Sequence, residues 1–120
     1  LKSTTNVYFD TGKWALSPMA KNELCAAAQQ ANQNENSLML VLGYTDTTGS
    51  QEFNQTLSEK RAAAVVNHLQ QVCKWKPYRM LTPTGMATAD PAADNTTAAG
   101  RAQNRRVSVN VLVSKALDGQ

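Results

Sequence analysis

The chain has 120 residues, of which 42% are hydrophobic and 18% charged, and a formal net charge of +3. These values are typical of one globular domain that buries a single core without obligatory cross-links. The longest apolar run, residues 38–42, is far too short to span a bilayer. Positive charge gathers only at Arg101, Arg105 and Arg106, without interleaved aromatic residues, which argues against a nucleic-acid-binding surface.

Two features bear on the cellular compartment. The start of the chain, Leu1-Lys2-Ser3, has neither the apolar segment nor the cleavage site of a secretion signal. The chain is therefore expected to be cytosolic, or to have lost a targeting segment by processing or trimming. Cys25 and Cys73 lack the spacing of zinc and redox motifs. Two cysteines in an exported domain often pair, whereas two in a cytosolic domain are usually inert, and we favour a disulfide between them.

The first half of the chain predicts a strand, a helix and a second strand. Residues 7–9, Val-Tyr-Phe, form a β-rich run that ends at the turn signal of residues 10–12. Ser17 and Pro18 fit the N-cap and the first position of a helix that ends at the polar residues 32–36. Residues 38–42 lack alternation, which predicts a central strand covered on both faces. The apolar stripe of the helix comprises Ala20, Leu24, Ala27, Ala28 and Ala31.

The second half predicts a long helix and two more strands. A loop over residues 43–49 leads to Ser50, a plausible N-cap. Residues 79–84 predict a third strand, where Pro83 marks an edge position or the strand's end. Residues 86–104 form a long loop with one or two helical turns at residues 96–103, and residues 107–113 alternate as a final strand before a frayed tail at residues 116–120. The predicted buried side of the long helix comprises Phe53, Leu57, Val65, Leu69 and Val72.

The predicted order of elements is β-α-β-α-β-loop-β. Helices between strands predict crossover connections, and so an α/β (α+β) two-layer sandwich with a mixed four-stranded sheet and helices packed on one side. No repeat or second composition regime interrupts the pattern. Residues 1–120 are therefore expected to form one domain, with a core over approximately residues 5–115 and flexible ends.

One group of polar residues predicts a ligand site. Asp46 follows the predicted central strand, and ligand sites in open α/β sheets commonly lie at strand ends. Arginine offers a planar fork to a carboxylate, aspartate accepts from an ammonium, and asparagine serves either group, so a small zwitterion fits this set. The alternative is structural: Asp46 stabilises the following helix N-terminus, or Arg61 forms a surface ion pair with Asp46 or Glu59. One face of the helix carries Asn54, Leu57, Ser58 and Arg61.

The same stretch resembles the signature of the OmpA-like C-terminal domain, the peptidoglycan-associated module that is also found in Pal lipoproteins and flagellar stator proteins. The family pattern is Gly-x-Thr-Asp-x-x-Gly, followed by Asn-x-x-Leu-Ser-x-x-Arg-Ala-x-x-Val. Two further blocks agree, namely residues 7–10 with Leu16 downstream and residues 95–107, so the match covers nearly the whole chain in order. The signature residues here are Gly43, Thr45, Asp46, Gly49, Asn54, Leu57, Ser58, Arg61, Ala62 and Val65.

The resemblance implies non-covalent binding of peptidoglycan through the diaminopimelate residue of its stem peptide. It assigns the ligand ammonium to Asp46 and the ligand carboxylate to Arg61, with Asn54 and Arg105 at the same site. Leu57 would form an apolar wall for the ligand's methylene chain. The residues of the loop that would border the pocket are Phe9, Asp10 and Thr11.

The resemblance also implies the biological setting. The domain would belong to a lipoprotein or membrane protein and anchor the outer membrane or an envelope complex to the cell wall, in the periplasm of a diderm bacterium. Membrane attachment would come only through segments outside this chain, and homodimers are possible. The family often has His where this chain has Tyr44.

Other functions compete with wall anchoring. A regulatory or scaffolding domain in the periplasm would bind mainly a protein partner. A peptidoglycan hydrolase needs a metal triad or an activated nucleophile, which one histidine, His68, and two dispersed cysteines do not readily supply. We therefore expect no enzymatic activity, no cofactor and no metal. Asp90, Asp94 and Asn95 fit turns better than a cation site.

Overall fold

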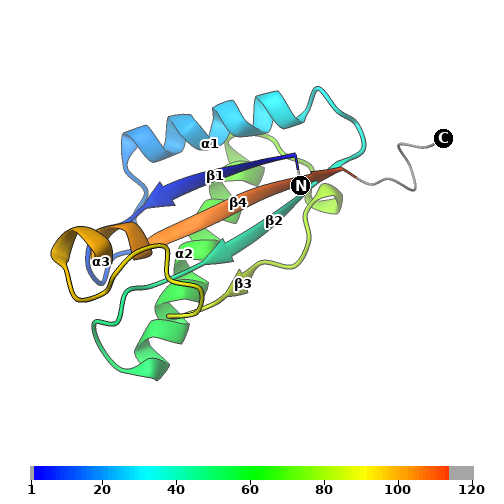
Figure 1. Cartoon of the computed structure of the whole chain (residues 1–120). Coiled ribbons are helices and arrows are strands. Elements are labelled where there is room, and N and C mark those ends of the chain that lie inside the picture. The colour runs from blue at the N-terminus through cyan, green and yellow to red at the C-terminus, as the bar shows by residue number, and fades with distance from the viewer. Residues whose placement is uncertain (1, 114–120) are drawn as a thin grey trace.

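The computed structural model describes residues 2–113 and places a four-stranded sheet against two long helices (Figure 1). The sheet has the order β1-β4-β2-β3, in which β4 runs antiparallel to β1 and β2, and β3 runs parallel to β2. The predicted mixed sheet is therefore confirmed. The elements are β1 (Ser3–Tyr8), α1 (Pro18–Ala31), β2 (Ser37–Gly43), α2 (Gln51–Gln71), η1 (Pro77–Arg79), β3 (Thr84–Gly85), α3 (Ala98–Asn104) and β4 (Arg106–Val113).

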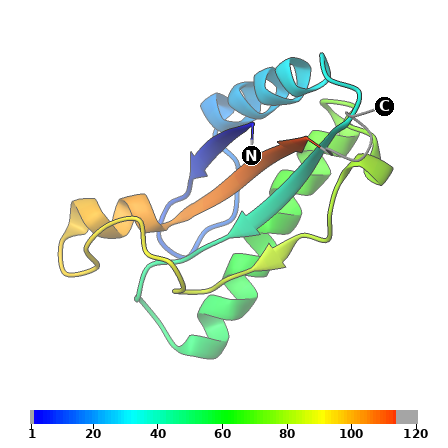
Figure 2. The same cartoon turned by 45° about the vertical axis from the view of Figure 1, so that its right-hand side comes forward.

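Both long helices begin where the sequence predicts. The Ser17 hydroxyl accepts a hydrogen bond from the backbone N–H of Ala20, and Pro18 is the first residue of α1. The Ser50 hydroxyl accepts from the N–H of Phe53 at the start of α2. Each side-chain acceptor satisfies a backbone donor that the first helical turn leaves free. Helices α1 and α2 lie on the same face of the sheet, as Figure 2 shows, and α3 lies beyond one end of β4.

The core lies between this face of the sheet and the two helices. Alternate residues of the central strand β4, Val107, Val109 and Val111, are buried there because strand side chains alternate between faces. They meet Leu24 of α1 and Val65 of α2 in one hydrophobic cluster. The cluster fixes both helices on the sheet and so sets the position of the loops at the strand ends.

Two features of the sequence-based prediction of the sheet, the covering of β2 and the bounds of β1, are wrong. Strand β2 is not covered on both faces, since its burial alternates and Leu38, Leu40 and Leu42 are only half-buried on the face without helices. Strand β1 spans Ser3–Tyr8 rather than residues 7–9, because its pairing with β4 extends to the N-terminal side. Phe9 follows the strand and is buried in the core.

The third strand lies at the edge of the sheet, as Pro83 predicted, but its predicted bounds, residues 79–84, are wrong. Residues Pro77–Arg79 form a 3-10 turn, Met80 makes one isolated bridge to Met39, and β3 comprises only Thr84–Gly85. Arg79 explains the loss of the strand, because its guanidinium donates to Ser37 and Asn34 and packs over Trp75 at 4.2 Å. These bonds hold Arg79 in the 3-10 turn, and between that turn and β3 the segment pairs with β2 through the bridge of Met80 to Met39 and the bond from the Leu81 N–H to the Met39 carbonyl. Pro83 lies just before β3 and has no N–H to donate.

Two of the five residues that are predicted for the buried side of α2 are exposed. Phe53 is 50% exposed and Val72 is 60% exposed, whereas the predicted Leu57, Val65 and Leu69 are buried. Val72 is the C-terminal cap of the helix, beyond its contact with the sheet. The short helix α3 confirms the predicted helical turns within the long loop. The predicted tail at residues 116–120 lies outside the described residues.

A disulfide joins Cys25 of α1 to Cys73, just past the end of α2. This confirms the pairing that we favoured from the sequence. The bond restrains the two helices relative to each other over a sequence separation of 48 residues. In the part of the chain that the structure describes, no helix combines the length and apolar character of a membrane span.

Gly43 marks the closest approach between β2 and α2. A Cβ atom added there would overlap the backbone carbonyl of Ser58, which neither element can move away from without shifting the core. We expect Gly43→Ala to destabilise the fold by more than about 3 kcal/mol, above the usual range for overpacking. Gly12→Ala is the control. The φ of +67° at this position strains an alanine backbone, but no atom lies within 4 Å of the added carbon. Urea unfolding measures both, and equal losses would contradict this account of Gly43.

Candidate functional site

The ends of three strands meet at a small charged pocket of about 240 Å³. It lies between the loop after β1, the loop after β2, the first turns of α2 and the residue before β4. This volume suits a group of amino-acid size rather than a drug-sized ligand. Five of the residues that the sequence analysis predicted line the pocket, namely Thr11, Asp46, Leu57, Arg61 and Arg105.

Asp46 is the anion of the pocket, and its side chain is only 5% exposed. Its Oδ1 accepts a hydrogen bond from the backbone N–H of Thr48 at 2.8 Å, and its Oδ2 accepts one from Nη1 of Arg105 at 3.1 Å. Burial alone raises the pKa of Asp46, but the bonds from Thr48 and Arg105 outweigh it and hold the pKa below its ordinary value. The carboxylate is therefore ionised at neutral pH.

Arg61 is the most buried cation of the described chain, with no exposed surface. Its guanidinium donates from Nε to the Lys13 carbonyl at 2.8 Å, from Nη1 to the Tyr44 carbonyl at 3.1 Å and from Nη2 to the Asp10 carbonyl at 3.0 Å. It also lies 5.2 Å from the centre of the Phe9 ring. Burial lowers the pKa of Arg61 to about 10, so it remains charged at neutral pH.

These bonds give Arg61 a structural task. Three of its five N–H donors hold the loop after β1 and the end of β2 together, around the start of the pocket. The alternative in which Arg61 forms a surface ion pair with Glu59 is therefore wrong, because Arg61 is buried. Two N–H donors are left over by these three bonds, and Arg61 lines the pocket.

Arg105 is the more accessible of the two arginines, with 17% of its side chain exposed. Its Nε donates to the Phe9 carbonyl at 2.8 Å, and its Nη1 reaches Asp46. The predicted loop residues Phe9 and Asp10 thus enter the site through their backbone carbonyls, and neither lines the pocket itself.

Asn54 and Tyr44 do not line the pocket either. Asn54 is buried on the pocket side of α2, near the position where a Cβ of Gly49 would lie. The Tyr44 ring instead packs against Arg106, whose guanidinium carbon lies 3.9 Å from its centre. Burial raises the pKa of Tyr44, although the charge of Arg106 opposes the shift. Only the Tyr44 carbonyl, which accepts from Arg61, takes part in the site.

Four residues that line the pocket were not among the predicted site residues, namely Gly12, Thr48, Gly49 and Phe53. Gly12 and Gly49 have φ of +67° and +90°, so glycine is the residue that these two loop turns accept without strain. Gly49 belongs to the signature, and its place before α2 was a usable signal. Phe53 had no such signal, because its spacing on α2 also fits a core position.

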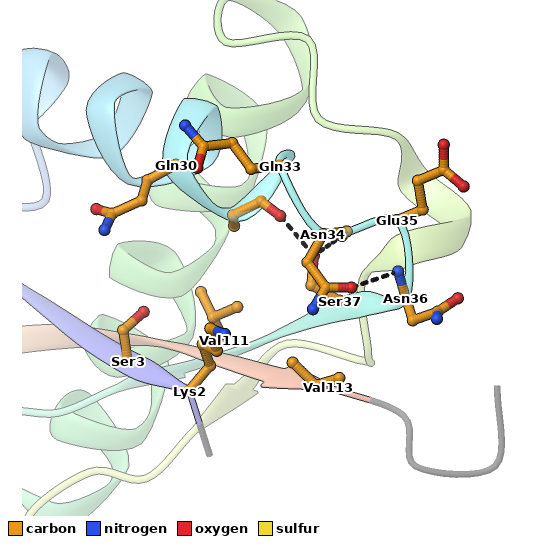
Figure 3. Close-up of a pocket in the computed structure, with 11 residues that line it drawn as sticks. Lys2, Ser3, Gln30, Gln33, Asn34, Glu35, Asn36, Ser37, Val111 and Val113 are labelled. Atoms are coloured by element: carbon orange, nitrogen blue, oxygen red, sulfur yellow. Dashed lines mark hydrogen bonds between the residues drawn. The ribbon is translucent and has the colours of Figure 1, made fainter. Parts of the chain in front are cut away.

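A larger pocket of about 630 Å³ lies at the opposite end of the sheet (Figure 3). Its lining is rich in amides such as Gln30, Gln33 and Asn36, and contains none of the predicted site residues. The Ser37 hydroxyl there donates to the Ala31 and Asn34 carbonyls. The charged pocket is the better candidate, because it gathers a carboxylate and two guanidinium groups around one space.

The fold and the pocket together define a small α/β domain that presents fixed charges of both signs at its strand ends. Comparison with known proteins identifies the family. The sequence profile of the OmpA family matches residues 8–105, and the chain therefore belongs to the OmpA family.

Individual relatives support this assignment. The chain is 34% identical over 111 residues to a protein of Escherichia coli named probable lipoprotein YiaD, and 36% identical over 110 residues to outer membrane protein A of Bordetella avium. Each match covers 92% of this chain but only 50% and 56% of the two relatives, so the chain spans about half of their length.

Solved structures share the fold. The peptidoglycan-associated lipoprotein of Burkholderia pseudomallei matches with a TM-score of 0.81 and 28% identity, over 89% of each chain. The C-terminal domain of Helicobacter pylori MotB matches with a TM-score of 0.83, over 96% of this chain and 90% of that one. Its identity of 19% supports the fold alone.

Arg61→Ala should destabilise the folded domain, because it leaves three backbone carbonyls without their donor. An unsatisfied buried acceptor costs about 1–3 kcal/mol, so we expect a loss of more than about 3 kcal/mol in urea unfolding. Lys60→Ala is the matched control, since Lys60 is exposed and its contact with the Trp14 ring contributes about 0.5–1 kcal/mol. Equal stabilities of the two variants would show that Arg61 does not hold the loops.

Asp46 should make the stability of the fold depend on acid pH. Its pKa in the folded state is lower than the ordinary 3.8, so the folded protein binds this proton less readily than the unfolded chain does. The stabilisation is present in full above the ordinary value and is lost as pH falls through the folded value. The stability difference between wild type and Asp46→Asn should therefore narrow below pH 3.8. A difference that is independent of pH would contradict the ionised pair.

Proposed function

We propose that this domain binds peptidoglycan non-covalently, through the ammonium and carboxylate groups of a diaminopimelate residue in the stem peptide. The observation that carries the proposal is the pocket that Asp46 lines together with Arg61 and Arg105, in a chain of the OmpA family. A relative with 28% identity and the same fold is named a peptidoglycan-associated lipoprotein. Binding of this kind would attach an outer membrane component or envelope complex to the cell wall, in the periplasm.

The charges of the pocket favour a zwitterionic amino-acid centre. One carboxylate and two guanidinium groups give the pocket a net charge of +1, which suits a ligand with one ammonium and at least one carboxylate. Asp46 retains acceptor capacity beyond its bonds with Thr48 and Arg105, since each carboxylate oxygen has two lone pairs. The ammonium is therefore assigned to Asp46.

The ligand carboxylate is assigned to both arginines, in different ways. Arg61 is held rigidly by three carbonyls and lines the pocket, so its charge can act on a ligand carboxylate without a loss of side-chain freedom on binding. Arg105 is partly exposed and can turn toward the ligand from Asp46. Leu57 and Phe53 provide apolar surface beside these charges, where the methylene chain of the ligand would pack.

The pocket does not suit a hydrolase. The only histidine of the chain, His68, lies two turns beyond Arg61 on α2 and beside the disulfide. Within residues 2–113 the pocket holds no cysteine or histidine, and its one carboxylate has a lowered pKa that suits neither a general acid nor a general base at neutral pH. We therefore propose a binding module rather than an enzyme.

Asp46→Asn should abolish binding to purified cell-wall sacculi while the fold persists. The substitution keeps the shape of the side chain but removes the charge that pairs with the ligand ammonium, and hydrogen bonds to charged groups contribute about 1.5–3 kcal/mol. A co-sedimentation assay measures binding, and circular dichroism confirms the fold. Glu52→Gln is the control, because Glu52 is an exposed carboxylate in the first turn of α2, just after the loop that carries Asp46, and does not line the pocket. Sedimentation of Asp46→Asn at the level of this control would refute the proposed site.

Free diaminopimelate should compete with sacculi, whereas lysine should compete poorly, because lysine lacks the carboxylate on the far carbon. Calorimetric titration of both compounds measures the difference. Equal affinities would show a general amino-acid clamp.

Release of soluble fragments from the sacculi would instead indicate an enzyme, and absence of both sedimentation and release would favour a protein partner.

A further inference from the structure

The single histidine of the chain lies beside its only two cysteines. The Nε2 atom of His68 is 3.7 Å from Sγ of Cys25, and one ligand atom from each of Cys25, His68 and Cys73 lies within 4.8 Å of the others. The three residues come from α1, from α2 and from the segment just after α2. The fold therefore brings two sulfurs and an imidazole together from three positions in the sequence.

Solvent reaches this cluster. All three side chains are half-buried, and both cysteines line a surface pocket of about 330 Å³ together with Gln29 and Asn32. Nε2 of His68 also lies 3.2 Å from the Lys21 carbonyl, a contact at the exposed edge of the cluster. His68 does not line this pocket, so an ion that enters there reaches the two cysteines first.

The spacing matches tetrahedral zinc coordination. Zinc–sulfur bonds of about 2.3 Å and zinc–nitrogen bonds of about 2.0–2.1 Å place a sulfur and a nitrogen ligand about 3.6 Å apart. The separation of 3.7 Å between Sγ of Cys25 and Nε2 of His68 is close to this value. The two sulfurs would have to separate to about 3.8 Å, which follows once the bond between them is reduced. Two thiolates and one imidazole form a soft ligand set that favours Zn²⁺ over Mg²⁺ or Ca²⁺.

We propose that the reduced chain binds one Zn²⁺ through Cys25, His68 and Cys73. An external dithiol supplies two electrons and two protons to the disulfide, forms its own disulfide, and leaves two thiols on the chain. Zn²⁺ then displaces both thiol protons and takes the imidazole nitrogen as its third protein ligand. A water molecule from the pocket takes the fourth position. The metal joins α1 to the end of α2 at the place where the disulfide joins them in the oxidised chain.

The test compares the oxidised and reduced whole chain. The reduced form is prepared with dithiothreitol and freed from it by gel filtration without oxygen. Titration with Zn²⁺ against a chromophoric chelator should show one site in the reduced chain and none in the oxidised chain. Co²⁺ as a substitute should give the near-ultraviolet absorption of a cobalt–thiolate bond.

Two variants on α2 separate the proposed site from binding by thiols alone. Loss of an outer partner of a metal ligand already costs about 10–100-fold in affinity, so loss of a ligand in His68→Ala should cost at least about 100-fold. Asn67→Ala, an exposed neighbour on the same helix, should bind like wild type. Equal affinity of His68→Ala and Asn67→Ala overturns the proposal, and so does a reduced wild type without stoichiometric zinc.

Reduction of the disulfide can unfold the chain and so change zinc binding indirectly. Circular dichroism therefore accompanies each titration. If the reduced chain loses helix signal, Zn²⁺ should restore the signal in wild type and in Asn67→Ala but not in His68→Ala. Restoration in all three chains, or in none, overturns the proposal.

Discussion

The candidate site depends on the hydrogen bonds that the buried guanidinium of Arg61 donates to backbone carbonyls. A cation without solvent contact is costly unless its donors are paired, and here three backbone carbonyls pair with it. Those carbonyls belong to Asp10 and Lys13, after β1, and to Tyr44, after β2. One side chain of α2 therefore holds two loops of the sheet at a fixed distance from the helix. The walls of the pocket follow from this arrangement.

The other two charged groups of the pocket, Asp46 and Arg105, form an ion pair with each other. Asp46 takes bonds from Thr48 and Arg105, and Arg105 reaches back to the Phe9 carbonyl, so the loop after β1 is bound by both arginines. A ligand ammonium would share Asp46 with Arg105 or displace it. Such an exchange replaces one charged bond by another, which keeps its net cost small. A site of this kind discriminates by the position of the ligand's charges more than by buried apolar area.

The sequence predicted the charged residues of the site better than its surroundings. Asp46, Arg61, Leu57 and Arg105 line one pocket as expected, because strand ends and one helix face limit where they can lie. Helical spacing also placed Phe53 in the core, but spacing does not reveal where a helix extends beyond the sheet, and Phe53 is exposed there. The edge strand expected at residues 79–84 comprises only Thr84–Gly85, because the bonds that hold Arg79 in a turn are tertiary and leave no local pattern. Nor did the sequence show that the donors of Arg61 serve the backbone.

Helix α2 links the charged pocket to the cysteine–histidine cluster. Arg61 and His68 are seven residues apart, about two helical turns, and so lie on similar sides of α2 at different heights. Between them the helix is fixed by Ala62 and Val65 in the core, and just before them by the close contact of Ser58 with Gly43. The cross-link at Cys73 restrains the end of α2 that lies away from the pocket, whereas the bonds of Arg61 restrain the loops near its start. Because a disulfide stabilises a fold mainly by restricting the unfolded chain, a change at the cross-link should alter the stability of the domain more than the geometry of the pocket.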